Sequence, residues 1–382
     1  MELSLGAPKA TKTPIEKGID DYFAVNASRL RPRTLGTYTE AIEKFRTWLS
    51  NNSVYLVEQL TKGKLSEFRS FLIMQKKTVI AEGGRRGERK KTEQAKSPFS
   101  INKDLHSVKG LVNFWRSREI LPSIDKDGIS DALKNVPTSK EAPAYLSPSD
   151  CRRLLEAALR HDSETFSETR DEHSGLKPIG STPRYEPIFP FVAFLLLTGC
   201  RLGEALNLRW SDIDLDALDA EGRKVGEIHL QATLTKTRRY RTIGLEVCPS
   251  LRSLLSEMKL KSGGEGYVFG GKSPRTKDSV ESARKRLLGV YGAAWFSWQN
   301  LRQTTGTFLT NAPGIYGAAS VFMSARQLGY SVTVAERHYL GVVRGIPREA
   351  RTLEAAMQAD DLFESQKTAE RTVVFDRSGK RR

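Results

Sequence analysis

The stretch LLLTGCRLGEALNLRW, residues 195–210, places an arginine at a break between two apolar segments. Residues 191–197 are all apolar, Thr-Gly-Cys at 198–200 interrupts them, and a helical pattern resumes directly after Arg201. A guanidinium in such a setting needs an anionic partner, because an unpaired buried charge is very costly. Either the fold or a substrate must therefore supply an anion to Arg201.

The balance of charge indicates a polyanionic partner. Lysines and arginines number 61 against 45 aspartates and glutamates, which gives a net charge of +16. This excess favours nucleic acid over a membrane surface, because no basic amphipathic helix or lipidation motif is evident. The alternative is a basic surface that is merely well solvated.

The sequence carries no signal of a membrane or secreted protein. No apolar run is long enough to span a bilayer, and the stretch MELSLGAPKATKTPIEKG lacks an apolar signal-peptide core. The three cysteines, Cys151, Cys200 and Cys248, are far apart and odd in number, which argues against a disulfide framework and a zinc site. We expect a cytoplasmic, nucleoid-associated protein that uses no metal and no other cofactor.

Helical periodicity dominates the first third of the chain. Apolar residues recur at helical spacing in 38–49 and 101–115, which predicts a small helical bundle over 14–134, after a flexible arm at 1–13. The segment KKTVIAEGGRRGERKKTEQAK, 76–96, breaks this pattern, and we expect a mobile basic loop there. Such a loop could contact DNA phosphates or be a solvated insertion without a partner.

A second domain follows a linker. Residues 135–147 are rich in Pro, Ser and Lys without an apolar stripe, and Ser-Pro-Ser-Asp at 147–150 is a helix-start signal. A polar surface insertion is expected at 161–187, and alternation over 225–245 predicts a β-hairpin with 236–239 at its tip. Helical patterns return at 249–260, 278–291, 299–310 and 348–363. The predicted fold class is mainly α with a small β-sheet, an α+β arrangement.

Three short motifs downstream of RLGE complete an ordered set. RLGE is 201–204, TKT is 235–237, QNLR is 299–302 and LGY is 328–330, with a tyrosine nine residues after Tyr330. Each motif alone is weak evidence. In this order they resemble the tyrosine recombinase, or phage integrase, family, in which an RxGE helix start, a hairpin lysine, an HxLR helix start and an LGH…Y segment build one active site. The resemblance covers about 146–345 well and extends loosely to 14–130.

The resemblance implies a domain organisation. Residues 14–134 are similar to the family's helical, SAM-like core-binding domain, and 148–345 would be the mixed α/β catalytic domain. In this family the two domains close round the duplex as a C-shaped DNA clamp. Residues 346–382 would form a C-terminal helix and a basic tail. The apolar face of that helix, Leu353, Ala356 and Met357, could dock into a neighbouring subunit or pack within its own chain.

The resemblance also implies an active site. Its catalytic residues would be Arg201, Lys236, Gln299, Arg302, Tyr330 and Tyr339, with Glu204 in support. Arg201 and Arg302 would clamp the non-bridging oxygens of a DNA phosphodiester and stabilise the charge of the transition state. The nucleophile Tyr339 would form a 3′-phosphotyrosine, which stores the bond energy so that resealing needs no ATP. Lys236 would protonate the leaving 5′-oxygen.

Two positions depart from the family pattern. Gln299 stands where the family usually has His, and Tyr330 stands where it usually has His or Trp. A glutamine can donate a hydrogen bond but cannot transfer a proton near neutral pH, and Tyr330 can donate through its hydroxyl or pack as Trp would. We expect an active enzyme. The alternative is a catalytically impaired relative that only binds DNA.

The resemblance thus implies a site-specific DNA recombinase or integrase that works as a tetramer on two double-stranded DNA sites through a Holliday junction. A single-site enzyme with the same chemistry, such as a topoisomerase-like or telomere-resolving relative, is a further alternative. Accessory DNA-bending or directionality proteins could assist it. Candidate DNA contacts are Lys76, Lys77, Arg85, Arg86, Arg89, Lys90, Lys91, Arg238, Arg239 and Arg241.

Overall fold

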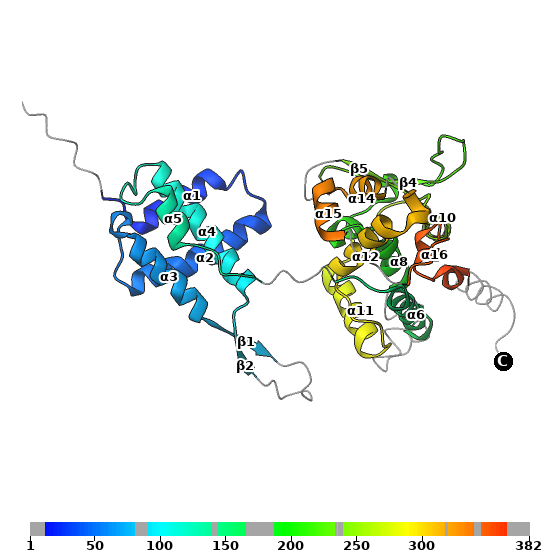
Figure 1. Ribbon diagram of the computed structural model, residues 1–382, viewed down its shortest axis with the longest axis horizontal. Helices are drawn as coiled ribbons and strands as arrows, with labels where there is room; N and C mark the ends of the chain where they lie inside the picture. Colours follow the sequence, from blue (N-terminus) through cyan, green and yellow to red (C-terminus); the bar gives the residue numbers. More distant parts are fainter. Residues whose placement is uncertain are drawn as a thin grey trace, which may run out of the picture. The chain divides into compact units, whose positions relative to one another are not determined.

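The computed structural model divides the chain into two compact units, Met1–Lys140 and Glu141–Arg382, and each is described by itself (Figure 1). The division falls inside the stretch 135–147. The structure describes residues 12–80, 91–138, 144–165, 187–233, 235, 240–317, 320–339 and 345–364. The expected fold class is confirmed, since both units are mainly helical with small antiparallel sheets.

The N-terminal unit is a helical bundle. Its helices are α1 (Ile15–Asn26), α2 (Pro32–Asn51), α3 (Lys62–Met74), α4 (Pro98–Ser117) and α5 (Lys126–Ala132), with the short 3₁₀ turn η1 (Val57–Gln59) before α3. Proline in the first turn starts α2 and α4, and the Ser97 hydroxyl caps α4. The apolar stripes face one core, where the buried Trp115 indole donates to the Gly18 carbonyl at 2.9 Å.

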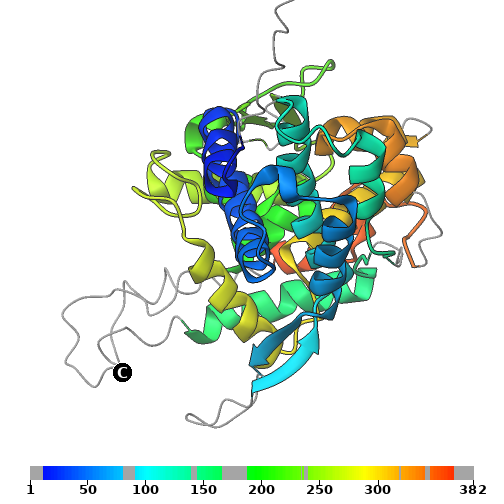
Figure 2. The same cartoon turned by 90° about the vertical axis from the view of Figure 1, so that its left-hand side faces the viewer.

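A two-stranded hairpin extends the bundle between α3 and α4 (Figure 1 and Figure 2). The strands β1 (Lys76–Ile80) and β2 (Lys91–Ala95) pair antiparallel, with Lys76 opposite Ala95. The expectation of a loop over 76–96 is therefore wrong for both ends of the segment. Backbone pairing, which the run of charges obscured in the sequence, orders these residues. Residues 81–90 lie outside the described part.

The C-terminal unit is built around a fully apolar helix. Helix α8 (Phe189–Thr198) is buried on every side, as expected for a helix that lacks a polar face. Around it lie α6 (Pro148–Thr165), α9 (Leu202–Leu206), α10 (Pro249–Ser262), α11 (Lys277–Gly289), α12 (Trp298–Asn311), α13 (Pro313–Tyr316), α14 (Ser320–Leu328) and α15 (Val332–Tyr339). Helix α12 packs against α8, α14 and α15, so it connects the central helix of the core to the two helices that carry the last motifs.

A three-stranded antiparallel sheet covers part of this unit. Its order is β3 (Ile213–Asp214), β4 (Glu227–Leu230) and β5 (Arg241–Gly244), and β3 follows the 3₁₀ turn η2 (Trp210–Asp212). The pair β4–β5 confirms the hairpin expected over 225–245, with Ile228 opposite Ile243. The strand β3 has no counterpart in the sequence analysis, because two residues are too short to show alternation.

The segments at both ends of this unit pack onto its body. Leu146, expected in a linker, is buried in the core, and its N–H donates to the Thr304 hydroxyl at 2.9 Å. At the other end, the single helix expected over 348–363 is wrong: α16 covers Leu353–Ala356, and a second helical stretch covers residues 360–364 of the described part. Thr352 caps the start of α16, and Gln358 takes a positive φ of 55° just after its end, which stops a continuous helix.

The apolar face expected on the C-terminal helix is buried within this chain. Leu353, Ala356 and Met357 all join the core of the C-terminal unit, and the N–H of Leu353 donates to the Val247 carbonyl at 2.7 Å. A bidentate ion pair between Arg152 and Asp361 adds to the attachment. The single chain therefore shows the segment packed in cis. No helix in the described ranges is both long and apolar enough to cross a membrane.

Candidate active site

The break after α8 brings two sequence motifs together. Gly199 ends α8 in the left-handed conformation, with φ of 64°. A Cβ on this glycine would lie 2.2 Å from Cδ2 of Leu328, at the start of the LGY motif. Only glycine therefore fits both the backbone and the close approach of the two segments.

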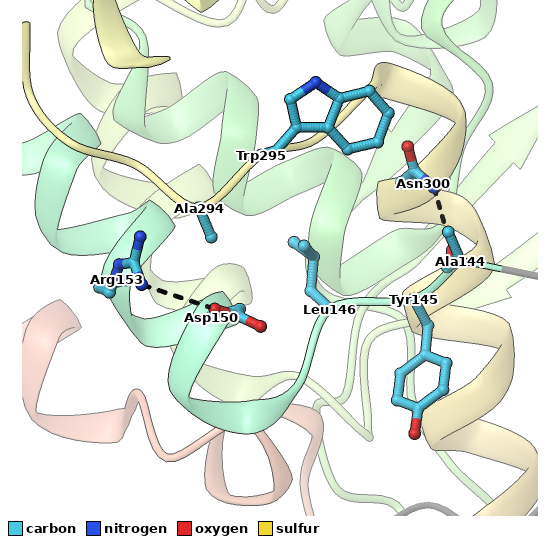
Figure 3. A pocket seen from close by; sticks show the side chains of 8 residues that line it. All are labelled: Ala144, Tyr145, Leu146, Asp150, Arg153, Ala294, Trp295 and Asn300. Atoms are coloured by element: carbon cyan, nitrogen blue, oxygen red, sulfur yellow. Dashed lines mark hydrogen bonds and ion pairs between the residues drawn. The ribbon is translucent and has the colours of Figure 1, made fainter. Parts of the chain in front are cut away.

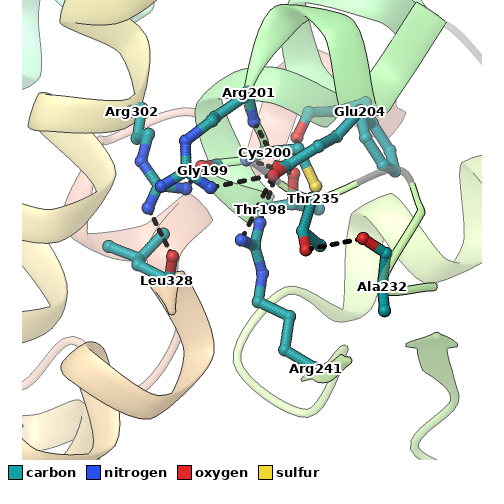
Figure 4. A network of polar contacts seen from close by, with 11 residues as sticks. Thr198, Gly199, Cys200, Arg201, Glu204, Ala232, Thr235, Arg241, Arg302 and Leu328 are labelled. Carbon is teal, nitrogen blue, oxygen red and sulfur yellow. Dashed lines mark hydrogen bonds and ion pairs between the residues drawn. The ribbon is translucent and has the colours of Figure 1, made fainter. Parts of the chain in front are cut away.

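Arg302 connects the same two segments from a third. It lies one turn into α12, is only 3% exposed, and donates to the carbonyl of Gly199 at 2.7 Å. Its second terminal nitrogen donates to the carbonyl of Leu328. Arg302 is thus bonded to Gly199, which lies two residues before Arg201 in the chain (Figure 4).

Glu204 gives Arg201 an anionic partner within the fold. Its carboxylate accepts the Arg201 guanidinium at 2.8 Å and the Arg201 backbone N–H at 2.8 Å. The other guanidinium on the carboxylate is that of Arg241, whose Nη2 lies 2.7 Å from Oε2. Glu204 therefore holds Arg201 in place, as the sequence analysis expected, but it is shared by two arginines (Figure 4).

The cluster keeps an excess of positive charge. Three guanidiniums, those of Arg201, Arg241 and Arg302, stand against the single carboxylate of Glu204. Burial would raise the pKa of Glu204, but the charge of Arg241 and the hydrogen bonds and charge of Arg201 lower it below its usual value. Glu204 is thus ionised, and a further anion at the exposed side of Arg201 would be stabilised.

Tyr330 and Gln299 occupy different environments. The Tyr330 ring lies 5.8 Å from the guanidinium carbon of Arg302, and its hydroxyl is 3.4 Å from that of Ser324. The ring can therefore stabilise the Arg302 cation. Gln299 is exposed in the first turn of α12, three residues before Arg302 on the same helix. The structure brings Tyr330 to the arginine cluster and leaves Gln299 open to solvent.

For the last two predicted catalytic residues, Tyr339 and Lys236, the structure describes only the neighbouring chain and not the side chain. Tyr339 is the final residue of α15, which packs against α12 and α14, and its side chain lies outside the described residues. Lys236 also lies outside them, between the buried Thr235 and β5. It precedes Arg241 by five positions, so the two Cα atoms are at most about 18 Å apart.

Arg241 is not the exposed DNA contact that its basic neighbours suggested. Its side chain is 7% exposed and paired with Glu204. The signal lay in the alternation of β5, since Arg241 and Ile243 both face inward while Thr242 and Gly244 are half-buried. Of the other candidate DNA contacts, Lys76 and Lys77 are exposed on β1 and the Lys91 backbone is in β2. The remaining ones lie outside the described residues: Arg85, Arg86, Arg89, Lys90, Arg238 and Arg239.

Asn300 is a second residue that the sequence analysis missed. It is buried beside Gln299, its amide oxygen accepts the N–H of Ser297 at 3.0 Å, and its amide nitrogen donates to the Ala144 carbonyl at 3.0 Å. It therefore anchors the start of α12 to the first residues of the unit. A pocket of about 290 Å³ lies beside this anchor, rimmed by the exposed Trp295 (Figure 3). It shares no residue with the arginine cluster.

Within the ranges that the structure describes, no group of three or more His, Cys, Asp or Glu side chains could hold a metal ion. The three cysteines are all buried, and burial raises their pKa values above the usual thiol range. The described groups of the site are three guanidiniums, one carboxylate and the phenol of Tyr330.

Part of the C-terminal unit is similar to a known protein family. Residues 180–314 match the phage integrase family. The resemblance to the tyrosine recombinase, or phage integrase, family is thereby confirmed. No curated protein sequence matches the chain.

Solved structures share the fold at low sequence identity. A lambda integrase dimer bound to a COC′ core site is 14% identical with a TM-score of 0.56, and the match covers 88% of this chain and 98% of that one. XerH site-specific recombinase bound to a palindromic difH substrate is 16% identical with a TM-score of 0.55, over 85% and 80% of the two chains. The Tn1549 transposon integrase in complex with circular intermediate DNA is 14% identical with a TM-score of 0.52, over 91% and 98%.

Proposed function

We propose that the protein is a site-specific DNA recombinase that cuts and rejoins double-stranded DNA through a 3′-phosphotyrosine intermediate. The observation that carries the proposal is the arginine cluster. Motifs that lie about a hundred residues apart in the sequence bring three guanidiniums together in a chain of net charge +16: Arg201 and Arg241 pair with Glu204, and Arg302 is bonded to the carbonyl of Gly199, two residues before Arg201. A DNA phosphodiester is an anion that resists attack, and this cluster fits its charge.

In the proposed reaction the Tyr339 oxygen attacks the scissile phosphorus, and the bond from phosphorus to the 5′-oxygen breaks. Arg201 and Arg302 stabilise the negative charge that grows on the non-bridging oxygens, and Lys236 protonates the leaving 5′-oxygen. Attack by the freed 5′-hydroxyl of a second strand reverses these steps and releases Tyr339. The bond energy is retained in the phosphotyrosine, so resealing needs no ATP, and the arginines supply the positive charge that a metal would otherwise provide.

The departures from the family pattern fit an active enzyme. Tyr330 keeps an aromatic ring at 5.8 Å from the Arg302 guanidinium, where a tryptophan could also pack. Gln299 is exposed on the helix of Arg302 and can donate an amide hydrogen bond to a bound phosphate. Binding itself depends on phosphate contacts, so its affinity falls steeply with salt, by a log–log slope of about −0.9 for each neutralised phosphate.

The working assembly in this proposal is a tetramer on two DNA sites that passes through a Holliday junction. Similar folds support it: one solved structure is a lambda integrase tetramer bound to a Holliday junction, 15% identical with a TM-score of 0.55. Within each protomer the two units would close round the duplex as a clamp. The C-terminal segment, which packs in cis here, would be exchanged between subunits in that assembly.

The test is capture of protein-linked DNA. Wild-type protein and two variants, Tyr339→Phe and Tyr330→Phe, are incubated with sheared genomic DNA from the source organism, denatured, and the attached DNA is sequenced. The proposal predicts adducts at one inverted-repeat sequence for the wild type, their loss in Tyr339→Phe, and their retention in Tyr330→Phe, which keeps its ring over Arg302. DNA binding without adducts in all three proteins would instead identify a catalytically silent DNA-binding relative.

A further inference from the structure

Arg241 begins β5 and lies where two motifs of the site meet. Its Nη2 is 2.7 Å from Oε2 of Glu204, in the RLGE motif, and its Nη1 is 3.4 Å from Oε1. Its side chain also lies against Gly329 of the LGY motif, where an added Cβ would be 2.9 Å from the Arg241 Cδ. β5 itself is the strand that follows the lysine of the hairpin. One buried side chain thus contacts two motifs, and its strand follows the third in the sequence.

The two arginines on Glu204 face different surroundings. Arg201 has a side chain that is 26% exposed, so a DNA phosphate can reach it. Arg241 is 7% exposed, and its Nε has no hydrogen-bond partner among the residues that the structure describes. A guanidinium held this deeply is placed to contact the carboxylate rather than the substrate.

We propose that Arg241 is a positioning residue of strand cleavage: it anchors Glu204 so that the carboxylate directs the Arg201 guanidinium to the scissile phosphate. The inference rests on the proposed function. Without Arg241, Glu204 would be a buried carboxylate with a single cation beside it. It would then protonate more readily and hold Arg201 less firmly.

The consequence is a defined dependence on pH. The ionisable groups around the carboxylate are Arg201 and Cys200, three and four residues before it in the chain, and Arg241 from β5, while Arg302 from α12 acts on Cys200. Burial raises the pKa of the Cys200 thiol, which therefore does not ionise on the acid side. Glu204 is therefore the group of this cluster that titrates on the acid side. Removal of Arg241 raises the pKa of Glu204. As the pH is lowered, the variant therefore loses cleavage at a higher pH than the wild type does.

The main experiment compares Arg241→Met, Arg241→Lys and the control Arg223→Met in single-turnover cleavage of a DNA site that traps the covalent adduct. Arg223 is an exposed arginine paired with Asp219 and Glu221, outside the site. We expect cleavage by Arg241→Met to fall about 10- to 100-fold at neutral pH, with its acid limb shifted upward. Arg241→Lys restores part of the rate, because it restores the charge, and Arg223→Met matches the wild type in rate and pH profile.

A double variant separates positioning from loss of fold. If Arg241 acts through Glu204, then Glu204→Gln with Arg241→Met cleaves no more slowly than Glu204→Gln alone. If Arg241→Met slows cleavage by the same factor in the wild type and in Glu204→Gln, that result overturns the inference. So does Arg241→Met with an unchanged rate and acid limb, or with weakened DNA binding as its only defect, which would restore Arg241 to the DNA contacts.

If the wild type forms no adduct, the proposed function is wrong. A measurement without DNA still tests the role of Arg241 in that case. Carboxyl ¹³C NMR titration of the full-length chain, with Glu204→Gln identifying the resonance, follows the pKa of Glu204 directly. We expect a pKa below the usual glutamate range in the wild type and in Arg223→Met, and a raised pKa in Arg241→Met. An unchanged pKa in Arg241→Met contradicts the anchoring role, whatever the enzymatic result.

Discussion

Glu204 and Glu354 are both buried glutamates of the C-terminal unit, yet their carboxyl groups are held in opposite ways. Glu204 contacts two guanidiniums and a backbone N–H, and its pKa is lowered. Glu354 has no cation among its hydrogen-bond partners in the described residues. One oxygen accepts the backbone N–H groups of Ser250 and Leu251 at the start of α10, and the other accepts none. Burial raises the pKa of Glu354 to about 7.

The difference shows that burial alone does not decide the ionisation of a carboxyl group. Two arginines outweigh the cost of burial at Glu204, whereas two backbone N–H groups at Glu354 do not. The first glutamate orders a cationic site that is open to an anion. The second attaches α16 to the N-terminus of α10 and so fixes the C-terminal segment to its own body.

The largest expected effect is that of Glu204→Gln. The substitution removes the negative charge between two arginines and leaves Arg241 as an uncompensated buried cation, which we expect to cost about 3–5 kcal/mol of unfolding free energy. DNA cleavage should fall about 10²- to 10³-fold, because Arg201 loses its orientation. Denaturant unfolding and adduct formation measure the two effects. Glu221→Gln is the matched control, since that carboxylate pairs with Arg223 on the surface; equal behaviour of both variants would contradict the account.

Glu354→Gln is expected to raise the free energy of unfolding, whereas Glu204→Gln lowers it. In the unfolded chain Glu354 ionises near the ordinary glutamate pKa of 4.5, whereas the folded protein keeps it protonated up to about pH 7. The pH-dependent cost of its burial is therefore absent below both values, and stability is lost progressively as the pH rises between them, by about 3 kcal/mol in all. Glu354→Gln should remove this slope, so that the variant is more stable than the wild type at pH 8 and equal to it at pH 4.

Unfolding curves at several pH values test the sign. The exposed Glu349→Gln serves as control and should follow the wild type throughout. A variant that is less stable than the wild type at pH 8 would show that Glu354 is ionised in the folded protein and that the raised pKa is wrong.

A glycine pair sharpens the argument for the Glu204 cluster. Gly329→Ala places a Cβ 2.9 Å from the Arg241 Cδ at a residue with φ of 68°, whereas Gly222→Ala adds a Cβ in open space at φ of 76°. Both variants bear the cost of a left-handed alanine, about 1 kcal/mol. We expect Gly329→Ala to lose about 1–3 kcal/mol more, because the contact displaces Arg241. Thermal unfolding of both variants gives the difference, and equal losses would mean that the Arg241 side chain is not fixed.

The smallest expected effect tests the attachment around Glu354. Thr352→Ala removes the hydroxyl that caps α16 at 3.1 Å from the Ala355 N–H, and we expect it to cost about 1 kcal/mol. It should also increase amide exchange at Ser250 and Leu251, since these N–H groups are protected by Glu354. Hydrogen exchange by mass spectrometry checks this. Unchanged exchange would show that Glu354 holds its position without the helix that carries it.

The sequence was informative where local rules act and silent where tertiary contacts decide. The break at 198–201 follows from a glycine between two apolar runs, and the hairpin over 225–245 follows from alternation. Arg241 was misplaced because the basic run around it suggested a surface, although its register with Ile243 pointed inward. No sequence signal marks Glu354, since only the packing of α16 against α10 makes that glutamate a buried cap.

The most direct test of the account is to identify the amino acid that carries the DNA. The trapped adduct is digested with nuclease and trypsin, and the peptides with a residual nucleotide are sequenced by mass spectrometry. The account predicts the nucleotide on Tyr339, the only tyrosine of the tryptic peptide HYLGVVR, 338–344. A nucleotide on Tyr330, in the peptide QLGYSVTVAER at 327–337, or on any other residue would contradict it.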